Sequence, residues 1–262
     1  MKNLAALVLL SLFLTAQSYA LVAIDDASAY GSSWSDGDTY GSGFGAWDLT
    51  STNNDGSTNF AGAFIGDSTA GAGDINTGTN QSFGLYANPG SAYIDATRGF
   101  ASNLAANDRF TFKLALNYAN GNKGFELRSG GTQVLGFNVG SETAVINTTY
   151  TDTAVVANYD YGGNDAIIDV VIDIINASSL SYQISRSSSA GLQGDLFTGT
   201  VTGIAATIDN FKFYINGTDN GDAQNNLYIN SLEVTNVPEP AHSVLICAII
   251  ALFLGIYRRR SN

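Results

Sequence analysis

The chain has 262 residues, with 23 acidic and 11 basic side chains, one cysteine and one histidine. This acidic balance repels the phosphate backbone of nucleic acids, so we exclude nucleic acid as a partner. The cysteine (Cys247) and the histidine (His242) lie near the C-terminus. The preceding chain therefore has no disulfide, no nucleophile that depends on cysteine or histidine, and no ordinary zinc site.

The N-terminus has the order of a secretory signal peptide. Met1-Lys2-Asn3 is a basic start, and an apolar stretch runs from Leu4 to Ala16. Ser18-Tyr19-Ala20 then offers small residues at the two positions that a signal peptidase reads. We predict that residues 1–20 are removed after Ala20 and that the rest of the chain is exported.

Residues 21–236 are predicted to form one all-β domain. Apolar and polar residues alternate over Phe110 to Tyr118, and Ile168 to Ile174 places aliphatic residues opposite Asp169 and Asp173. Turn clusters rich in Asn, Asp and Gly separate such segments, and long helical patterns are absent before the C-terminal run. This pattern favours a single antiparallel β-sandwich, and the length favours a jelly-roll of the concanavalin-like type.

Paired carboxylates are the remaining route to catalysis in this domain. Asp169 and Asp173 share one strand face but lie about 13 Å apart along it, too far for either glycosidase geometry. Glu126 lies two residues from Arg128 on a polar face, where a surface ion pair is expected. We assign no catalytic residue and expect the protein not to be an enzyme.

Calcium is a possible cofactor, because it takes six to eight oxygen ligands and several turns are rich in Asp and Asn. The weak candidates for a calcium site are Asp36, Asp38, Asp219 and Asp222. Turns need the same residue types for backbone reasons alone, so both interpretations stay open.

Aromatic side chains could stack on sugar rings. Trp34 lies between serines and Asp36, which suggests an exposed ring and makes it a weak ligand candidate. Trp47 begins an apolar alternation and is expected in the core. The remaining candidates for stacking are Tyr30, Tyr40, Tyr86 and Tyr93.

Residues 237–262 form a distinct C-terminal tail. Pro238-Glu239-Pro240 cannot continue a helix, an uncharged apolar run follows from Ser243 to Tyr257, and Arg258-Arg259-Arg260 come next. This order resembles the PEP-CTERM sorting signal of exported bacterial proteins. The alternative is a permanent single-pass anchor, although the run would rise only about 22 Å as a helix against roughly 30 Å of bilayer core.

The resemblance implies a delivery route. An exosortase would recognise Pro238, Glu239 and Pro240, while the apolar run would lie in the inner membrane with Arg258, Arg259 and Arg260 on the cytoplasmic side. The processing partners would be exosortase and signal peptidase, and the destination the cell envelope, surface or extracellular matrix of a bacterium.

Two functions remain for the exported domain. It could be a structural envelope or matrix protein associated with extracellular polysaccharide, or a carbohydrate-binding adhesin assisted by calcium. A carboxylate-dependent enzyme acting on glycans is a minor alternative.

Overall fold

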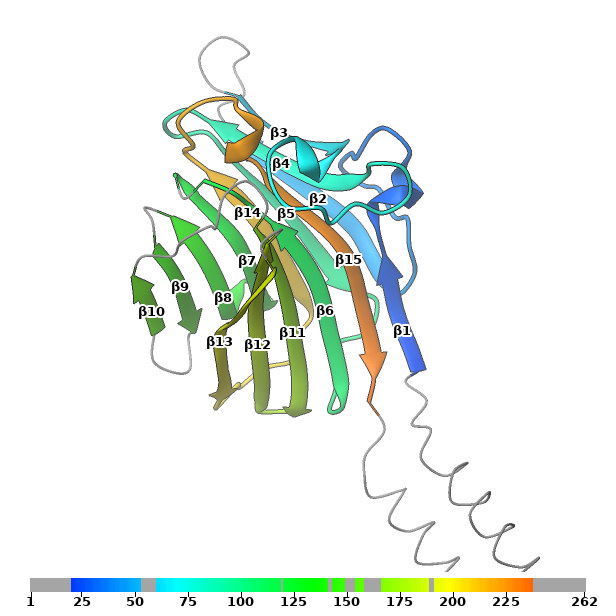
Figure 1. Ribbon diagram of the computed structural model, residues 1–262. Helices are drawn as coiled ribbons and strands as arrows, with labels where there is room; N and C mark the ends of the chain where they lie inside the picture. The colour runs from blue at the N-terminus through cyan, green and yellow to red at the C-terminus, as the bar shows by residue number, and fades with distance from the viewer. Residues whose placement is uncertain are drawn as a thin grey trace, which may run out of the picture.

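The computed structural model describes residues 20–52, 60–118, 120–140, 143–148, 154–157, 166–188 and 191–237. These residues form β-strands and three short 3-10 helices, and none of their helices is long and apolar enough to cross a membrane (Figure 1). Apart from Ala20, the predicted signal peptide lies outside the described residues. So do the Pro238-Glu239-Pro240 motif, the apolar run and the three terminal arginines.

The described strands make two antiparallel sheets. Sheet A contains β1 (Ala20–Asp25), β3 (Phe60–Gly66), β4 (Ser82–Asn88), β6 (Asp108–Ala115), β11 (Ile167–Asn176), β12 (Ser179–Ser188), β13 (Gly191–Thr202) and β15 (Leu227–Asn236). Sheet B contains β2 (Phe44–Thr52), β5 (Tyr93–Phe100), β7 (Asn122–Ser129), β8 (Thr132–Gly140), β9 (Thr143–Thr148), β10 (Ala154–Ala157) and β14 (Asn210–Asn216). The 3-10 helices are η1 (Ala27–Tyr30), η2 (Ser68–Ala70) and η3 (Ala223–Asn225).

The chain passes repeatedly between the two sheets. Sheet A has the order β13-β12-β11-β6-β15-β4-β3, with β1 also paired to β15, and sheet B has the order β10-β9-β8-β7-β14-β5-β2. Figure 1 shows the two sheets as facing layers. The prediction of an all-β antiparallel sandwich is confirmed.

Alternation along the strands separates core from surface, as predicted. In β11 the side chains of Ile168, Val170, Ile172 and Ile174 are buried, while Asp169 and Asp173 on the opposite face are half-buried. The facing strands of sheet B bury a matching set: Phe125, Leu127, Leu135, Phe137, Phe211, Phe213 and Ile215. Each such side chain contributes roughly 1.5–3 kcal/mol on leaving water, so this interlayer core holds a domain that has no disulfide.

The first and last described strands lie side by side. Ala20 of β1 pairs with Asn236 of β15, and the pairing continues to Asp25 opposite Leu232. The start of β1 and the end of β15 therefore lie at the same end of the sandwich, as the blue and orange strands show in Figure 1.

Candidate functional site

Trp34 is buried, contrary to its predicted exposure. Only 4% of this residue is exposed, and its ring lies 4.9 Å from that of Trp47 in an edge-to-face arrangement. The cause is the loop before β2, where hydrogen bonds from Gly37 N to Trp47 O and from Trp47 N to Asp38 O fold Trp34 inward. Trp34 therefore cannot stack on a ligand at the surface. The expectation that Trp47 belongs to the core is confirmed.

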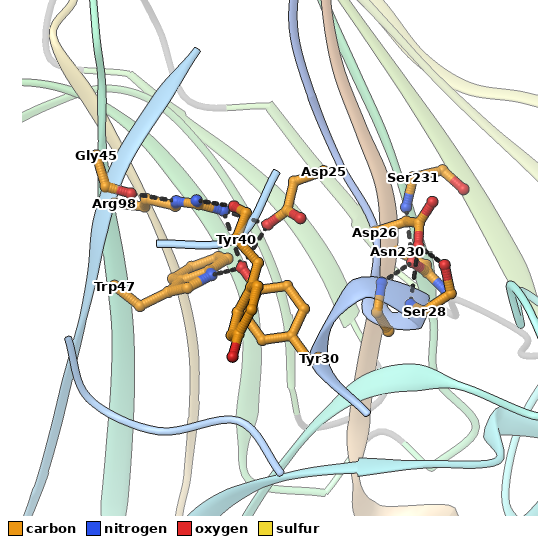
Figure 2. Close-up of polar contacts among 11 residues, drawn as sticks. Asp25, Asp26, Ser28, Tyr30, Tyr40, Gly45, Trp47, Arg98, Asn230 and Ser231 are labelled. Carbon is orange, nitrogen blue, oxygen red and sulfur yellow. Dashed lines mark hydrogen bonds and ion pairs between the residues drawn. The ribbon is translucent and has the colours of Figure 1, made fainter. Parts of the chain in front are cut away.

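A buried polar network surrounds Arg98 (Figure 2). Its guanidinium forms an ion pair with Asp25 and donates hydrogen bonds to the carbonyl oxygens of Gly45 and Tyr40, both at 2.7 Å. The Tyr30 hydroxyl donates to Asp25 at 2.6 Å. Burial raises the pKa of the Asp25 carboxyl, and the contacts with Tyr30 and Arg98 oppose this rise.

This network has a structural role. The side chains of Arg98 and Asp25 have no exposed surface, so a ligand from solvent does not reach them. The ion pair joins β1 of sheet A to β5 of sheet B, and the guanidinium also lies 4.9 Å from the Trp47 ring centre. The network therefore fixes the N-terminal strand against the opposite sheet.

The four calcium candidates are used mainly in turns. The Asp36 carboxylate accepts a hydrogen bond from Leu49 N, and the Asp38 carboxylate accepts one from Ser35 N. Asp219 accepts from the Asn120 amide, and Asp222 precedes η3. Within the described part of the chain, no group of three or more Asp, Glu, His or Cys side chains could hold a metal ion. Calcium binding stays a prediction.

The outer face of sheet A carries the expected solvated carboxylates. Asp169 pairs with Lys113 at 3.0 Å, and Asp173 pairs with Arg109 at 2.6 Å. Both pairs join directly opposed residues of β11 and β6. Each carboxylate is thus neutralised by its own cation, which is consistent with the predicted surface role.

The outer faces of both sheets are hollowed. On sheet A a depression of about 440 Å³ lies beside Arg109, Asp173 and Tyr182; the one on sheet B groups more charged and amide side chains. The sheet B depression, of about 550 Å³, opens over strands β5, β7, β8 and β14, beside the turn that begins at Gly90. The polar side chains that line it are Ser91, Tyr93, Asp95, Asn122, Glu126, Asn138, Lys212, Tyr214 and Asn216. This volume lies within the usual range for small-ligand sites.

Lys212 lies at the centre of the charged part of this depression. Its ammonium is 3.4 Å from the Asp95 carboxylate and 3.2 Å from that of Glu126, and it lies 5.2 Å from the centre of the Tyr214 ring. Arg128 lies two positions along β7 on the same face and approaches the Glu126 carboxylate at 3.5 Å. The expected pairing of Glu126 with Arg128 is therefore present, but Lys212 is the closer cation.

Amides form the other part of the depression. The Tyr214 hydroxyl donates to Asn138 Oδ1 at 2.9 Å, the Asn138 amide donates to Asn122 at 3.1 Å, and the Asn122 amide donates to Asn216 at 3.3 Å. Burial raises the pKa of Tyr214, and the charges of Glu126 and Asp95 raise it further, so the phenol stays protonated. A row of neutral donors and acceptors thus lies beside the charged cluster.

The strand register explains how these groups meet. Tyr214 of β14 lies opposite Gly124 of β7, which lies opposite Asn138 of β8. Because Gly124 has no side chain, the Tyr214 hydroxyl reaches across β7 to Asn138. A Cβ atom at Gly124 would lie 1.8 Å from the carbonyl oxygen of Phe137, so the glycine is required there.

Most of this site was not predicted from the sequence. The sequence offers Tyr93 as a stacking candidate and Glu126 as a carboxylate, but no motif marks Lys212, Tyr214 or Asn138. The available signal was the alternation over residues 210–216, which places Lys212 and Tyr214 on one face. Strand order decides which residues lie beside Lys212 and Tyr214 on neighbouring strands, and strand order cannot be read from the sequence.

Known proteins resemble this chain only distantly. No protein-family model and no curated protein matches the sequence. Among solved structures, galectin LEC-6 of Caenorhabditis elegans is 16% identical with a TM-score of 0.32, over 51% of this chain and 85% of that one. A toad ovary galectin in complex with thio-digalactose is 14% identical with a TM-score of 0.35, over 55% of this chain and 99% of that one. An endo-β-1,4-glucuronan lyase from the fungus Trichoderma reesei is 11% identical with a TM-score of 0.43, over 77% and 94% of the two chains. At these scores the likenesses carry no weight in the argument about function.

Proposed function

We propose that the domain of residues 21–236 is an exported carbohydrate-binding domain and that its ligand occupies the depression on the outer face of sheet B. The observation that carries this proposal is the grouping of two tyrosines, three amides and two carboxylates around one hollow of about 550 Å³. Sugars present hydroxyl groups that donate and accept hydrogen bonds, and their ring faces are apolar. Amide and carboxylate groups suit the hydroxyls, and an aromatic ring such as Tyr93 suits the ring face.

This proposal selects the adhesin alternative for the domain while keeping its association with extracellular polysaccharide. A purely structural matrix protein needs no hollow with this grouping of tyrosines, amides and carboxylates. The repeated crossing of the chain between the sheets supports the jelly-roll, concanavalin-like classification as part of the same proposal.

Catalysis is not included in the proposal. The Lys212 ammonium lies between Asp95 and Glu126, in the space that a scissile bond would have to enter between two catalytic carboxylates. The enzyme alternative is tested by incubating purified protein with the polysaccharides described below and measuring newly formed reducing ends and unsaturated products. Turnover that is lost in Glu126→Gln would establish the enzyme instead.

The binding test uses residues 21–236, which begin at the N-terminus predicted after cleavage at Ala20. Binding to a broad glycan panel is measured with calcium and with chelator, for the unaltered protein and for Tyr93→Ala and Asn138→Ala. We expect saturable binding to one glycan class and at least a tenfold loss in both variants. Tyr40→Ala is the matched control, because Tyr40 is 52% exposed and lies near Arg98, at the other end of β5 from Tyr93. A flat panel with a folded protein would reject the proposal, and loss on chelation would identify calcium as a cofactor.

We also propose that the C-terminal tail delivers the domain as an exosortase substrate. The support is the order of Pro238-Glu239-Pro240, apolar run and arginines, and the pairing of Ala20 with Asn236, which suits a domain joined at one pole to both predicted membrane segments. Replacing Pro238, Glu239 and Pro240 by alanine is expected to retain the protein in the inner membrane with its tail attached. Normal surface delivery of that variant would refute the sorting assignment.

A further inference from the structure

We propose that the depression on sheet B selects uncharged glycans and rejects acidic ones, and that the pairing of Lys212 with Asp95 and Glu126 sets this selectivity. This inference rests on the proposed carbohydrate binding and specifies its ligand class.

The charged lining carries an excess of one negative charge. Asp95, Glu126 and Lys212 are its ionised side chains, and the ammonium of Lys212 already contacts both carboxylates. Arg128 lies outside the lining, contacts Glu126, and donates to the carbonyl oxygen of Gly131 at 2.6 Å. The cations around the hollow are therefore engaged by protein acceptors.

Lys212 is also held in place. Its side chain retains 15% of its exposed surface and packs on the Tyr214 ring, with the ammonium 5.2 Å from the ring centre. To bind a uronate, a sulfate or a phosphate, Lys212 would have to leave two carboxylates. Those carboxylates would then face the incoming anion at close range, where like charges in a partly desolvated site repel strongly.

The neutral part of the lining has no such conflict. Asn122, Asn138 and Asn216 form a chain of amides that ends on the Tyr214 hydroxyl, and none of these groups needs a charged partner. Each carboxylate has oxygen lone pairs beyond its contact with Lys212, and these can accept hydrogen bonds from sugar hydroxyls. The amide row and the carboxylates can thus both form hydrogen bonds with sugar hydroxyls while the ion pairs of Lys212 stay intact.

The test compares polysaccharides that share a backbone and differ in charge. The probes are hydroxyethyl cellulose with carboxymethyl cellulose, and fully methyl-esterified homogalacturonan with polygalacturonate, measured by affinity electrophoresis at low and at physiological salt. The unaltered protein should bind the neutral member of its preferred pair at least tenfold more tightly. Binding to neither member of any pair, with a flat glycan panel, would reject the proposed function itself. Equal or tighter binding to the acidic member would reject only the selectivity.

Two sets of variants then locate the cause. Asp95→Asn with Glu126→Gln frees the Lys212 ammonium, and we expect it to raise binding of the acidic member at least tenfold, with an effect that salt weakens. Lys212→Met removes the only cation among the described residues of the lining, so we expect binding of the acidic member to fall and the preference for the neutral member to remain. It also keeps the proposal testable if the double variant does not fold.

The matched control removes the same number of charges from the other sheet. Asp169→Asn with Asp173→Asn removes the carboxylate partners of Lys113 and Arg109 on the outer face of sheet A, beside the separate depression on that sheet, so the net charge of the chain changes equally. If this control gains acidic binding as strongly as Asp95→Asn with Glu126→Gln, selectivity comes from overall charge and the proposal is overturned. If only the sheet B variant gains it, the depression is the origin.

Discussion

Arg98 and Asp25 form an ion pair between two side chains that have no exposed surface, and the pair connects the two sheets of the sandwich. Removing two ions from water is costly, and hydrogen bonds to the remaining groups of a buried pair offset part of that cost. The carbonyl oxygens of Gly45 and Tyr40 take two of the guanidinium donors, and Tyr30 donates to the carboxylate. The N-terminal strand is therefore held by a specific arrangement of charges as well as by apolar packing.

Breaking this pair on one side should destabilise the fold severely. Arg98→Met leaves the Asp25 carboxylate buried without its cation, and we expect a loss of about 3–5 kcal/mol in the free energy of unfolding. Asp25→Leu combined with Arg98→Met should cost much less than the sum of the single changes, because neither charge is then left alone. Urea unfolding of the two single variants and the double variant measures the coupling. Additive losses would contradict the proposed dependence of each ion on the other.

Asn230 is a second buried junction, shown beside the first in Figure 2. Its amide oxygen accepts from Ala27 N at 3.0 Å, and its amide nitrogen donates to the carbonyl oxygens of Ile75 and Gln81 at 2.9 and 2.8 Å. Asn230→Ala would remove this partner from Ala27 N and from the Ile75 carbonyl, while the Gln81 carbonyl keeps its bond from Thr77 N, so we expect a loss of about 3 kcal/mol in unfolding free energy. Asn236→Ala is the control, because Asn236 makes a part-buried hydrogen bond to the Asp108 carboxylate. Equal melting temperatures for the two variants would contradict this role.

The strands could be predicted from the sequence because alternation is a local property. The faces of β6 and β11 follow directly from which residues are apolar, and the structure buries the predicted faces. Trp34 shows where local reasoning fails. Its polar neighbours suggest exposure, but backbone hydrogen bonds between its loop and the following strand β2 turn the ring inward.

The candidate site depends on non-local pairing, which the sequence does not reveal. Tyr214 and Asn138 are separated by 76 positions, and Lys212 and Asp95 by 117, yet each pair is in contact. The alternation identifies which side chains point outward, but only the strand order shows that these particular residues share one hollow. Glu126 illustrates the difference, since its sequence neighbour Arg128 was found and its closer partner Lys212 was not.

Gly124 is expected to be essential for the shape of the depression. A Cβ atom there would lie 1.8 Å from the carbonyl oxygen of Phe137, so Gly124→Ala must move β7 or β8 and should cost about 1–3 kcal/mol. The same shift would separate Tyr214 from Asn138 and weaken glycan binding. Gly131→Ala is the matched control, since a Cβ atom at Gly131 meets no atom within 4 Å. A Gly124→Ala protein with unchanged stability and binding would disprove the requirement.

Lys123 should make the stability of the domain depend on pH above neutrality. Its ammonium is buried and donates to the carbonyl oxygens of Tyr118 at 2.8 Å and Asn225 at 2.7 Å, and burial lowers its pKa from 10.5 to about 7. The nearby charge of Asp219 opposes that shift. A neutral amine still has two N–H groups, which match the two carbonyl acceptors, so the folded state keeps both hydrogen bonds after losing the proton.

The sign of the effect follows from proton counting. Between pH 7 and 10.5 the lysine of the unfolded chain holds a proton that the folded chain has released, so unfolding takes up a proton and stability rises with pH. The slope is at most about 1.4 kcal/mol per pH unit. Urea unfolding at several pH values between pH 7 and roughly pH 9 should show this rise, and Lys123→Met should remove it. Lys113→Met should retain it, since Lys113 is a half-exposed partner of Asp169. Tyr214, whose pKa is raised by burial, acts in the opposite direction only above its ordinary value of 10.0, beyond this range. Parallel pH profiles for the unaltered protein and Lys123→Met would show that Lys123 keeps its proton in the folded state, held by the two carbonyls and Asp219.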